Sequence, residues 1–301
     1  MNDYLRESFS YFGLFKKMAK VKKVIEPEYF YFGEDENSGV FRDGDKGGES
    51  CAAGCDDLKK DMYFLYYEPK TVTSDKIIVW VHGGGWNAGD PKFFDYVGQC
   101  IAGAGYRFVS IGYRLSPKHK YPCQINDVCA GFNSTINFLR KKNIDTSKII
   151  VAGPSAGAHL TSIMCYSKDI QQANHVDISP IIGYIGFGGP YSFRNDNSLT
   201  LKMLLNQLFK KGDDKKTGEP VSLMTKNHIP MLLIQSKHDG IISFACAEDF
   251  ARKAQDVGNS CEIYSVIDKK NTHSWYTAGL FLEPREENKA LDKFFSWIEQ
   301  L

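Results

Sequence analysis

The sequence lacks any apolar run near the roughly 20 residues that cross a bilayer. It also lacks an excess of one charge, since 37 lysine and arginine residues stand against 36 aspartate and glutamate residues. Near the N-terminus, Asp3, Arg6 and Glu7 interrupt the apolar stretch that a secretory signal peptide needs. We therefore expect no membrane association, no nucleic-acid partner and a cytoplasmic location.

Cysteines at the spacing of a metal site are also lacking. The eight cysteines are scattered, and Cys51 and Cys55 form the only close pair. Two further ligands at a metal-binding spacing do not follow this pair. In a chain of this length without a secretory signal, free buried thiols are the expected state. The sequence therefore predicts no disulfide framework, no metal and no cofactor.

At 301 residues the chain has the length of a large α/β domain, and we interpret residues 1–301 as a single domain. Short apolar runs alternate with helix-like patterns from about residue 60. This alternation predicts a mostly parallel central sheet flanked by helices, with ligands at the carboxyl ends of the strands. The predicted strands span residues 62–67, 77–81, 106–112, 148–152, 181–187, 231–235 and 261–267. The predicted helices span residues 93–104, 123–142, 156–166, 199–209, 244–257 and 286–301.

Three segments lie outside this alternation. Residues 1 to about 25 carry apolar side chains at helical intervals, which predicts an amphipathic helix packed on the body of the protein. Residues 33–57 are rich in Gly, Asp, Glu and Ser and predict a surface loop. Residues 192–226 interrupt the rhythm with a helical patch and a charged loop, which indicates an insertion.

The most informative stretch is Gly-x-Ser-x-Gly, which ends the predicted strand 148–152 and begins the helix that follows. A strand that turns sharply into a helix holds the central residue, here Ser155, in a strained position at the tip. The N-terminus of the helix then faces any negative charge that forms there. These features favour a nucleophilic serine, and the alternative is a glycine-rich turn that contains a serine by chance.

A serine hydroxyl needs a base to become nucleophilic, and in this setting the chain order is serine, acid, histidine. His273 follows the last predicted strand and is the predicted base. The alternative is a histidine in a surface loop without a catalytic role. His238 is interpreted as a neighbour of the acid and not as the base.

The predicted acid is Asp239, which follows the strand 231–235 and precedes a helix. Its role is to hold the imidazole in one tautomer and to stabilise the charged form. The competing candidate is Asp268, which lies five residues before His273.

The oxyanion of an acyl-transfer intermediate needs preorganised N–H donors. The amide of Ala156, directly after the serine, is one predicted donor. A glycine loop, His82-Gly83-Gly84-Gly85, follows the strand 77–81 and predicts further donors. The alternative, a phosphate-binding turn, is disfavoured because the sequence contains neither a P-loop nor a dinucleotide-binding glycine pattern at this point. His82 itself is predicted to brace the loop.

Taken together, these motifs resemble those of the hormone-sensitive-lipase-like and kynurenine-formamidase-like carboxylesterases, over about residues 60 to 300. The chain departs from the family pattern at Pro154 and in the residues that flank Asp239. The residues that carry the resemblance are His82 to Trp86, Tyr113 to Pro117, Tyr121, Pro122, Asp127, Gly153 to Leu160, Asp239 and His273.

The resemblance implies an α/β-hydrolase fold with a small helical cap, formed by residues 1–32 and 192–226. It also implies that the amides of Gly84, Gly85 and Ala156 form the oxyanion hole. Three residues take structural roles by the same resemblance: Asp127 and Arg114 brace the fold, and His159 packs within its helix.

The predicted function is hydrolysis of a small carboxylic ester by a serine hydrolase with Ser155, His273 and Asp239 as catalytic triad. One alternative is an amidase that cleaves an N-formyl or aryl amide, such as N-formylkynurenine, with the same residues. Another is a non-catalytic interaction protein on the same fold. The expected partner is a small-molecule ester, and the protein itself is expected to be a monomer or a homodimer.

Aromatic residues near the strand-end face are the predicted substrate-binding residues, with core packing as the alternative for each. Bulky side chains there would leave room for only a short acyl chain, which is our hypothesis for specificity. These residues are Trp86, Phe187, Tyr191, Phe193 and Trp275.

Overall fold

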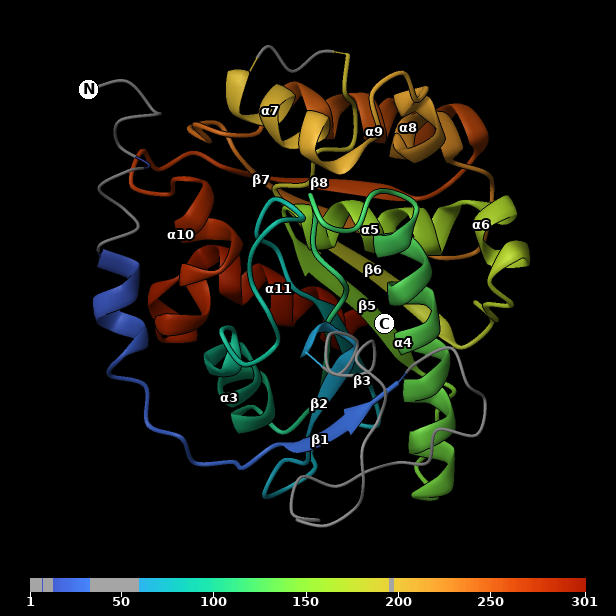
Figure 1. Ribbon diagram of the computed structural model, residues 1–301. Helices are drawn as coiled ribbons and strands as arrows, with labels where there is room; N and C mark the ends of the chain where they lie inside the picture. Colours follow the sequence, from blue (N-terminus) through green and yellow to red (C-terminus); the bar gives the residue numbers. More distant parts are fainter. Residues whose placement is uncertain (1–6, 8–12, 33–59, 195–197) are drawn as a thin grey trace.

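The structure is a computed structural model that describes residues 7, 13–32, 60–194 and 198–301. Within these ranges, eight strands form one sheet in the order β1-β2-β4-β3-β5-β6-β7-β8 (Figure 1). β1 and β2 pair antiparallel with their neighbours, and the pairs from β4 to β8 are parallel. The strands are β1 (Glu28–Tyr31), β2 (Tyr63–Tyr67), β3 (Ile77–Val81), β4 (Arg107–Ile111), β5 (Ile149–Pro154), β6 (Ile181–Phe187), β7 (Met231–Ser236) and β8 (Cys261–Val266).

Helices cover both faces of the sheet, as the strand–helix alternation predicts (Figure 1). The α-helices are α3 (Asp95–Gly103), α4 (Cys123–Lys141), α5 (Ala156–Tyr166), α6 (Lys168–Ala173), α7 (Leu199–Leu208), α8 (Pro220–Leu223), α9 (Phe244–Val257), α10 (His273–Thr277) and α11 (Lys289–Gln300). The 3₁₀ helices are η1 (Lys215–Gly218), η2 (Gly279–Leu282) and η3 (Arg285–Glu287).

Each strand contributes to two cores because successive side chains point to opposite faces of a sheet. In β3, Ile77, Val79 and Val81 pack in the core beneath α4, α5 and α9. Ile78 and Trp80 pack in the core beneath α3 and α11. All five side chains of β3 are fully buried, which explains why this strand is a continuous apolar run and not an alternating one.

The mostly parallel sheet flanked by helices, which the strand–helix alternation predicts, is present. Every predicted strand is present, with ends within two residues of the prediction. β1 was not predicted: residues 28–31, which we expected in the cap, pair with β2 at the edge of the sheet. Aromatic packing of Phe30 against Phe64 and Phe138, at centroid distances of 5.2 and 4.0 Å, holds this short strand in place. The loop predicted over 33–57 lies outside the described residues.

We call residues 1–27 the N-terminal segment. Within it, residues 13–18 form a short helical stretch that lies beside α10 (Figure 1). The insertion 192–226 contains α7, η1 and α8. No helix in the described parts of the chain is long and apolar enough to span a membrane.

Candidate active site

Ser155 lies at the junction of β5 and α5, in a backbone conformation that residues other than glycine seldom adopt. Its φ is +50° and its ψ is −118°, outside the regions that sterics favour. The strained position is held from two sides. The Ser155 N–H donates to the carbonyl of Phe187 at 2.7 Å, and its own carbonyl accepts from the His159 N–H at 3.0 Å. The serine is therefore presented at the tip of a tight turn, as the sequence motif predicts.

The glycine after the turn is required by close packing. A Cβ on Gly157 would lie 2.0 Å from the carbonyl oxygen of Val81, the last residue of β3. The start of α5 thus lies directly against the end of the neighbouring strand. This contact brings Ser155 next to the loop that follows β3.

That loop is the glycine loop, and its backbone turns through left-handed conformations. Gly84, Gly85 and Trp86 have φ values of +115°, +59° and +62°. The Gly84 carbonyl accepts from the amides of Asn87 and Ala88 at 3.2 and 3.0 Å, which closes the turn. A Cβ on Gly84 would lie 2.1 Å from the Ala88 oxygen, so only glycine fits this position.

The three amides predicted as oxyanion donors lie around this junction. Gly84 and Gly85 line the same cavity as Ser155, and Ala156 is the first residue of α5. Among the described residues, none of these three N–H groups has a hydrogen-bond partner. Gly84 and Gly85 thus border the cavity directly, and Ala156 lies next to Ser155.

His82 braces the glycine loop, as predicted. Its ring is buried, lies 2.8 Å from the Gly83 carbonyl through Nδ1, and stacks on Tyr113 at a centroid distance of 4.3 Å. Burial lowers the pKa of His82 to about 4, so the ring is neutral near pH 7 and Nδ1 donates to the carbonyl.

His159 does more than pack within α5. Its Nδ1 accepts from the Trp86 indole N–H at 3.2 Å, and its Nε2 donates to the Gly218 carbonyl at 2.7 Å. Burial lowers the pKa of His159 to about 4, which keeps the ring neutral and able to play both roles. The residue therefore joins the glycine loop to the insertion 192–226.

Asp239 follows β7, and its side chain is fully buried. One carboxylate oxygen accepts from the amides of Ile241 and Ile242 at 2.8 and 2.7 Å. The other lies 2.7 Å from Nδ1 of His273 and accepts from the hydroxyl of Tyr276 at 2.5 Å. Such a set of donors stabilises the ionised carboxylate and fixes its orientation.

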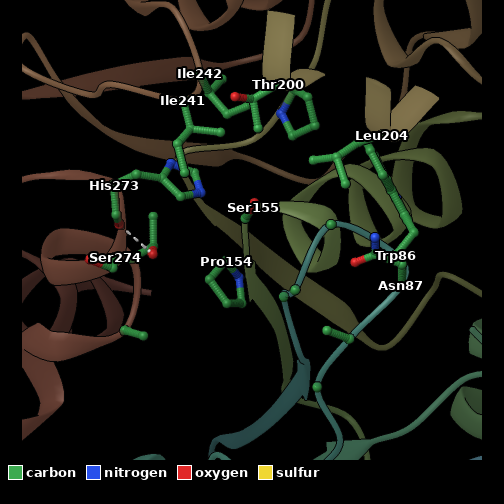
Figure 2. A pocket seen from close by; sticks show the side chains of 18 of the residues that line it. Trp86, Asn87, Pro154, Ser155, Thr200, Leu204, Ile241, Ile242, His273 and Ser274 are labelled. Carbon is green, nitrogen blue, oxygen red and sulfur yellow. Dashed lines mark hydrogen bonds between the residues drawn. The ribbon is translucent and has the colours of Figure 1, made fainter. Parts of the chain in front are cut away.

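His273 is the first residue of α10. Its position after the last strand suggests a loop residue, and the structure shows a short helix instead. Its ring is almost completely buried, and Nδ1 is engaged by Asp239. Figure 2 shows the imidazole pointing towards Ser155 across the cavity that both residues line. The hydrogen bonds found in the described part of the chain do not include one between the Ser155 hydroxyl and this ring.

The competing acid Asp268 and the neighbouring His238 are placed differently from Asp239 and His273. Asp268 is exposed, and its carboxylate accepts from the Lys270 amide at 2.9 Å. His238 is half-buried beside Asp239, and its amide donates to the Ser236 hydroxyl at 3.0 Å.

Tyr276 was missed by the sequence analysis. It is fully buried, and burial together with the nearby Asp239 raises its pKa well above the usual value, so the phenol remains a donor. The spacing of three residues from His273 would have placed both side chains on one face of a helix. That signal became visible only once α10 was known to be a helix.

Several known proteins are similar to this chain in sequence or in fold. Carboxylesterase NlhH of Mycobacterium tuberculosis is 34% identical over 117 residues, which cover 38% of this chain and 37% of NlhH. The chain thus matches little more than a third of the length of this curated relative. Esterase B from Lactobacillus rhamnosis superposes with a TM-score of 0.75 at 16% identity, over 97% of this chain and 91% of that chain. A hormone-sensitive lipase from a metagenome library superposes with a TM-score of 0.62 at 20% identity, over 79% and 82%.

The profile of the BD-FAE family matches residues 64–254, more than half of the chain. The chain belongs to the BD-FAE family. The predicted resemblance to carboxylesterases of the α/β-hydrolase fold is therefore confirmed. The BD-FAE match includes the glycine loop, the serine turn and Asp239, whereas His273 and the N-terminal segment lie outside it.

The cavity beside Ser155 has a volume of about 520 Å³ and is lined mainly by apolar groups. Among the described lining residues, none is an aspartate, glutamate, lysine or arginine. Besides the strand-end loops, the N-terminal segment and α7 contribute side chains to this cavity. Figure 2 shows Leu204 of α7 opposite His273. The apolar side chains that line it include Leu14, Phe15, Trp86, Phe93, Phe94, Leu201, Leu204, Ile241 and Ile242.

Of the aromatic residues expected to bind substrate, the structure places only Trp86 among those that line this cavity. Phe187, at the end of β6, points into the core and packs against Trp80 at 5.8 Å. Tyr191 is fully buried and stacks on Phe250 at 4.4 Å.

The other two aromatic residues also pack away from the cavity. Phe193 lies against His159 and Phe209, at centroid distances of 5.7 and 6.2 Å. Trp275 is half-buried beneath Lys17, whose Nζ lies 4.5 Å from the ring centroid. Side-chain direction on β6 and α10 turns Phe187 and Trp275 away, whereas Tyr191 and Phe193 lie in the irregular segment after β6, whose path the sequence does not reveal.

Arg114 and Asp127 play the structural role that the resemblance implies. The guanidinium forms a two-pronged ion pair with the buried carboxylate, at 2.8 and 2.6 Å, and the Arg114 amide also donates to it at 2.9 Å. The pair ties the segment after β4 to the first turns of α4. No cluster of three or more potential metal ligands occurs in the described part of the chain.

Proposed function

We propose that this protein is a serine hydrolase that cleaves small carboxylic esters through an acyl-enzyme. The observation that supports the proposal is a single cavity bordered by Ser155, the glycine loop and His273, whose imidazole is held by the buried carboxylate of Asp239. The carboxylesterase relative supports the same reaction class.

In the proposed mechanism, the Ser155 oxygen attacks the ester carbonyl while Nε2 of His273 takes the hydroxyl proton. Asp239 holds Nδ1–H and stabilises the imidazolium that forms. The negative charge on the former carbonyl oxygen is stabilised by the amides of Gly84, Gly85 and Ala156. Collapse of this intermediate breaks the bond to the alcohol, which leaves with the proton from His273.

Water then attacks the acyl-enzyme by the reverse route. His273 takes a proton from the water, the same amides stabilise the second tetrahedral intermediate, and the acid leaves as the proton returns to Ser155. Each step needs only the side chains named here and one water molecule.

The proposed substrate is uncharged near its scissile bond and carries a short apolar acyl group. An apolar cavity without aspartate, glutamate, lysine or arginine among its described lining residues disfavours a charged substrate, because the desolvation of the charge would not be compensated. We further propose that residues 1–32 and 192–226, apart from β1, act as a cap within a single domain. The support is that Leu14 and Phe15 from the first segment and Thr200, Leu201 and Leu204 from the second line the cavity.

The deciding experiment compares the parent with Ser155→Ala, using p-nitrophenyl acetate and a fluorophosphonate probe that labels activated serines. We expect the variant to lose labelling and kcat to fall by about 10⁴-fold or more. Ser260→Ala, which changes an exposed serine far from the cavity, is the matched control and is expected to behave like the parent. Turnover by Ser155→Ala at the parent rate, or a parent that neither turns over esters nor reacts with the probe, would contradict the proposal.

A further inference from the structure

The N-terminal segment places a carboxylate directly on the backbone of the proposed base. Glu7 is 3% exposed, although glutamate is seldom buried without partners. Its two oxygens accept from the amides of His273 and Ser274 at 2.6 and 2.8 Å. A residue 266 positions away in the sequence therefore satisfies both N–H groups at the start of α10.

These N–H groups need a partner that the local sequence does not supply. The first turn of a helix has amides without intrahelical acceptors, and a side chain just before the helix normally accepts from them. Thr272 stands at that position in α10 and makes no such bond to the helix. Glu7 replaces the missing local cap from a distant part of the chain.

The same contact completes the set of bonds that orient the imidazole. The His273 carbonyl accepts from the Thr277 hydroxyl at 2.5 Å, and its Nδ1 is engaged by Asp239 at 2.7 Å. Glu7 adds the bond at the amide, so the residue is held at its N–H, its carbonyl and its ring. Displacement of a catalytic group by about 1 Å can lower a rate by about 10²-fold, so this third bond bears on catalysis.

The N-terminal segment has a second attachment that does not involve α10. The Gln99 side chain on α3 accepts from the amides of Val24 and Ile25 at 2.9 and 3.0 Å and donates to the Ile25 carbonyl at 2.7 Å. General anchoring of the segment and local support of His273 can therefore be separated by mutation.

We propose that Glu7 is a positioning residue for His273 in the ester hydrolysis described above, so that the N-terminal segment sets the geometry of the base. The inference rests on the proposed function for its kinetic consequence. The prediction that Glu7 orders the start of α10 holds independently of any substrate.

The test compares Glu7→Ala, Glu7→Gln and Gln99→Ala in the full chain. Hydrogen–deuterium exchange of peptides covering 268–282 is measured alongside kcat and KM for p-nitrophenyl acetate and the thermal midpoint. We expect Glu7→Ala to exchange faster in that peptide and to lose about 10- to 100-fold in kcat with KM within about twofold. Glu7→Gln retains the size of the side chain and one acceptor oxygen, so an intermediate loss is expected. Gln99→Ala is expected to retain the parent kcat and the parent exchange of 268–282.

Parent-like exchange and kcat in both Glu7 variants would overturn the proposal. An equal loss of kcat in Gln99→Ala would also overturn it, because general anchoring would then explain the effect. If Glu7→Ala does not fold, the exchange of residues 268–282 and the kcat of Glu7→Gln decide whether the proposal holds. Parent protein without esterase activity would refute the proposed function instead, and the exchange measurement would still decide whether Glu7 orders α10.

Discussion

Two regions meet at the cavity and are built by different means. We call one the floor, which consists of the glycine loop, Ser155, Asp239 and His273. The other, the wall, consists of the cavity-lining residues of the N-terminal segment and of α7. The floor depends on backbone amides, left-handed φ values and buried hydrogen bonds. The wall consists mostly of apolar side chains that line the cavity.

The difference indicates how each region responds to change. A backbone donor can be aimed only by the path of the main chain, so the floor leaves little freedom at each position. An apolar wall needs only suitable volume, and exchange of one hydrophobic residue for another is often tolerated. The floor is therefore expected to control the rate, and the wall to control which acyl group is accepted.

The largest effect is expected from the floor at Asp239. Asp239→Asn removes the charge that orients and stabilises the imidazole, and we expect kcat to fall by about 10⁴-fold. Asp268→Asn, which alters the exposed carboxylate nearer in sequence, is the control and is expected to stay within about twofold of the parent. A larger loss in Asp268→Asn than in Asp239→Asn, measured by ester turnover, would reverse the assignment of the acid.

The next effect tests the backbone of the glycine loop. Gly84→Ala introduces a Cβ that would lie 2.1 Å from the Ala88 oxygen, so the loop must shift. We expect kcat to fall by about 10²- to 10³-fold, the loss typical of a missing oxyanion donor. Gly212→Ala is the control, since Gly212 also has a positive φ but has open space around its Cα. Near-parent kcat in Gly84→Ala would remove this loop from the oxyanion hole.

A smaller effect concerns His159, which joins the glycine loop to the insertion 192–226. Its pKa is about 4 in the folded protein against 6.5 for an ordinary histidine, because burial disfavours the charged ring. As pH falls below 6.5 the unfolded chain binds the proton first, so the stabilisation present above pH 6.5 is lost progressively towards pH 4. Between pH 7 and pH 5 this amounts to about 2 kcal/mol in the free energy of unfolding.

Chemical denaturation at both pH values measures this loss. His82, whose pKa is also about 4, contributes a similar amount in the parent. His159→Gln retains an acceptor for Trp86 and a donor for Gly218 without a titrating ring. The variant is therefore expected to lose about 2 kcal/mol less than the parent over this pH range. An identical pH dependence in both proteins would show that His159 does not titrate in this way.

The smallest effect is expected from the wall. Leu204→Ala shortens a side chain of α7 that lies close to Gly85, and we expect the preferred acyl chain to lengthen, with kcat for acetate changed only a few-fold. Met203→Ala, on the exposed side of the same helix, is the control. A p-nitrophenyl ester series from acetate to dodecanoate measures the shift. A parent optimum at eight carbons or longer would contradict the short acyl site.

Much of the floor could be predicted because its parts are short local motifs at strand ends. The residues around Ser155 and Gly84 predict a strained turn and a glycine loop from the local sequence alone. The contact between Asp239 and His273 was inferred from chain order and is present in the structure. Tyr276 could not be found in this way, because its role depends on a helix, α10, that is only five residues long.

The sequence by itself determined the strands from β2 to β8, the serine turn and the glycine loop, because these depend on apolar periodicity and on glycine at fixed positions. Only the tertiary structure decided which side chains border the cavity and which backbone amides donate to Glu7 and to Gln99. Such contacts join residues far apart in the chain, and their partners depend on how whole elements pack. Phe187 and Tyr191 illustrate this: both are aromatic and lie at or just after the end of β6, yet both pack into the core.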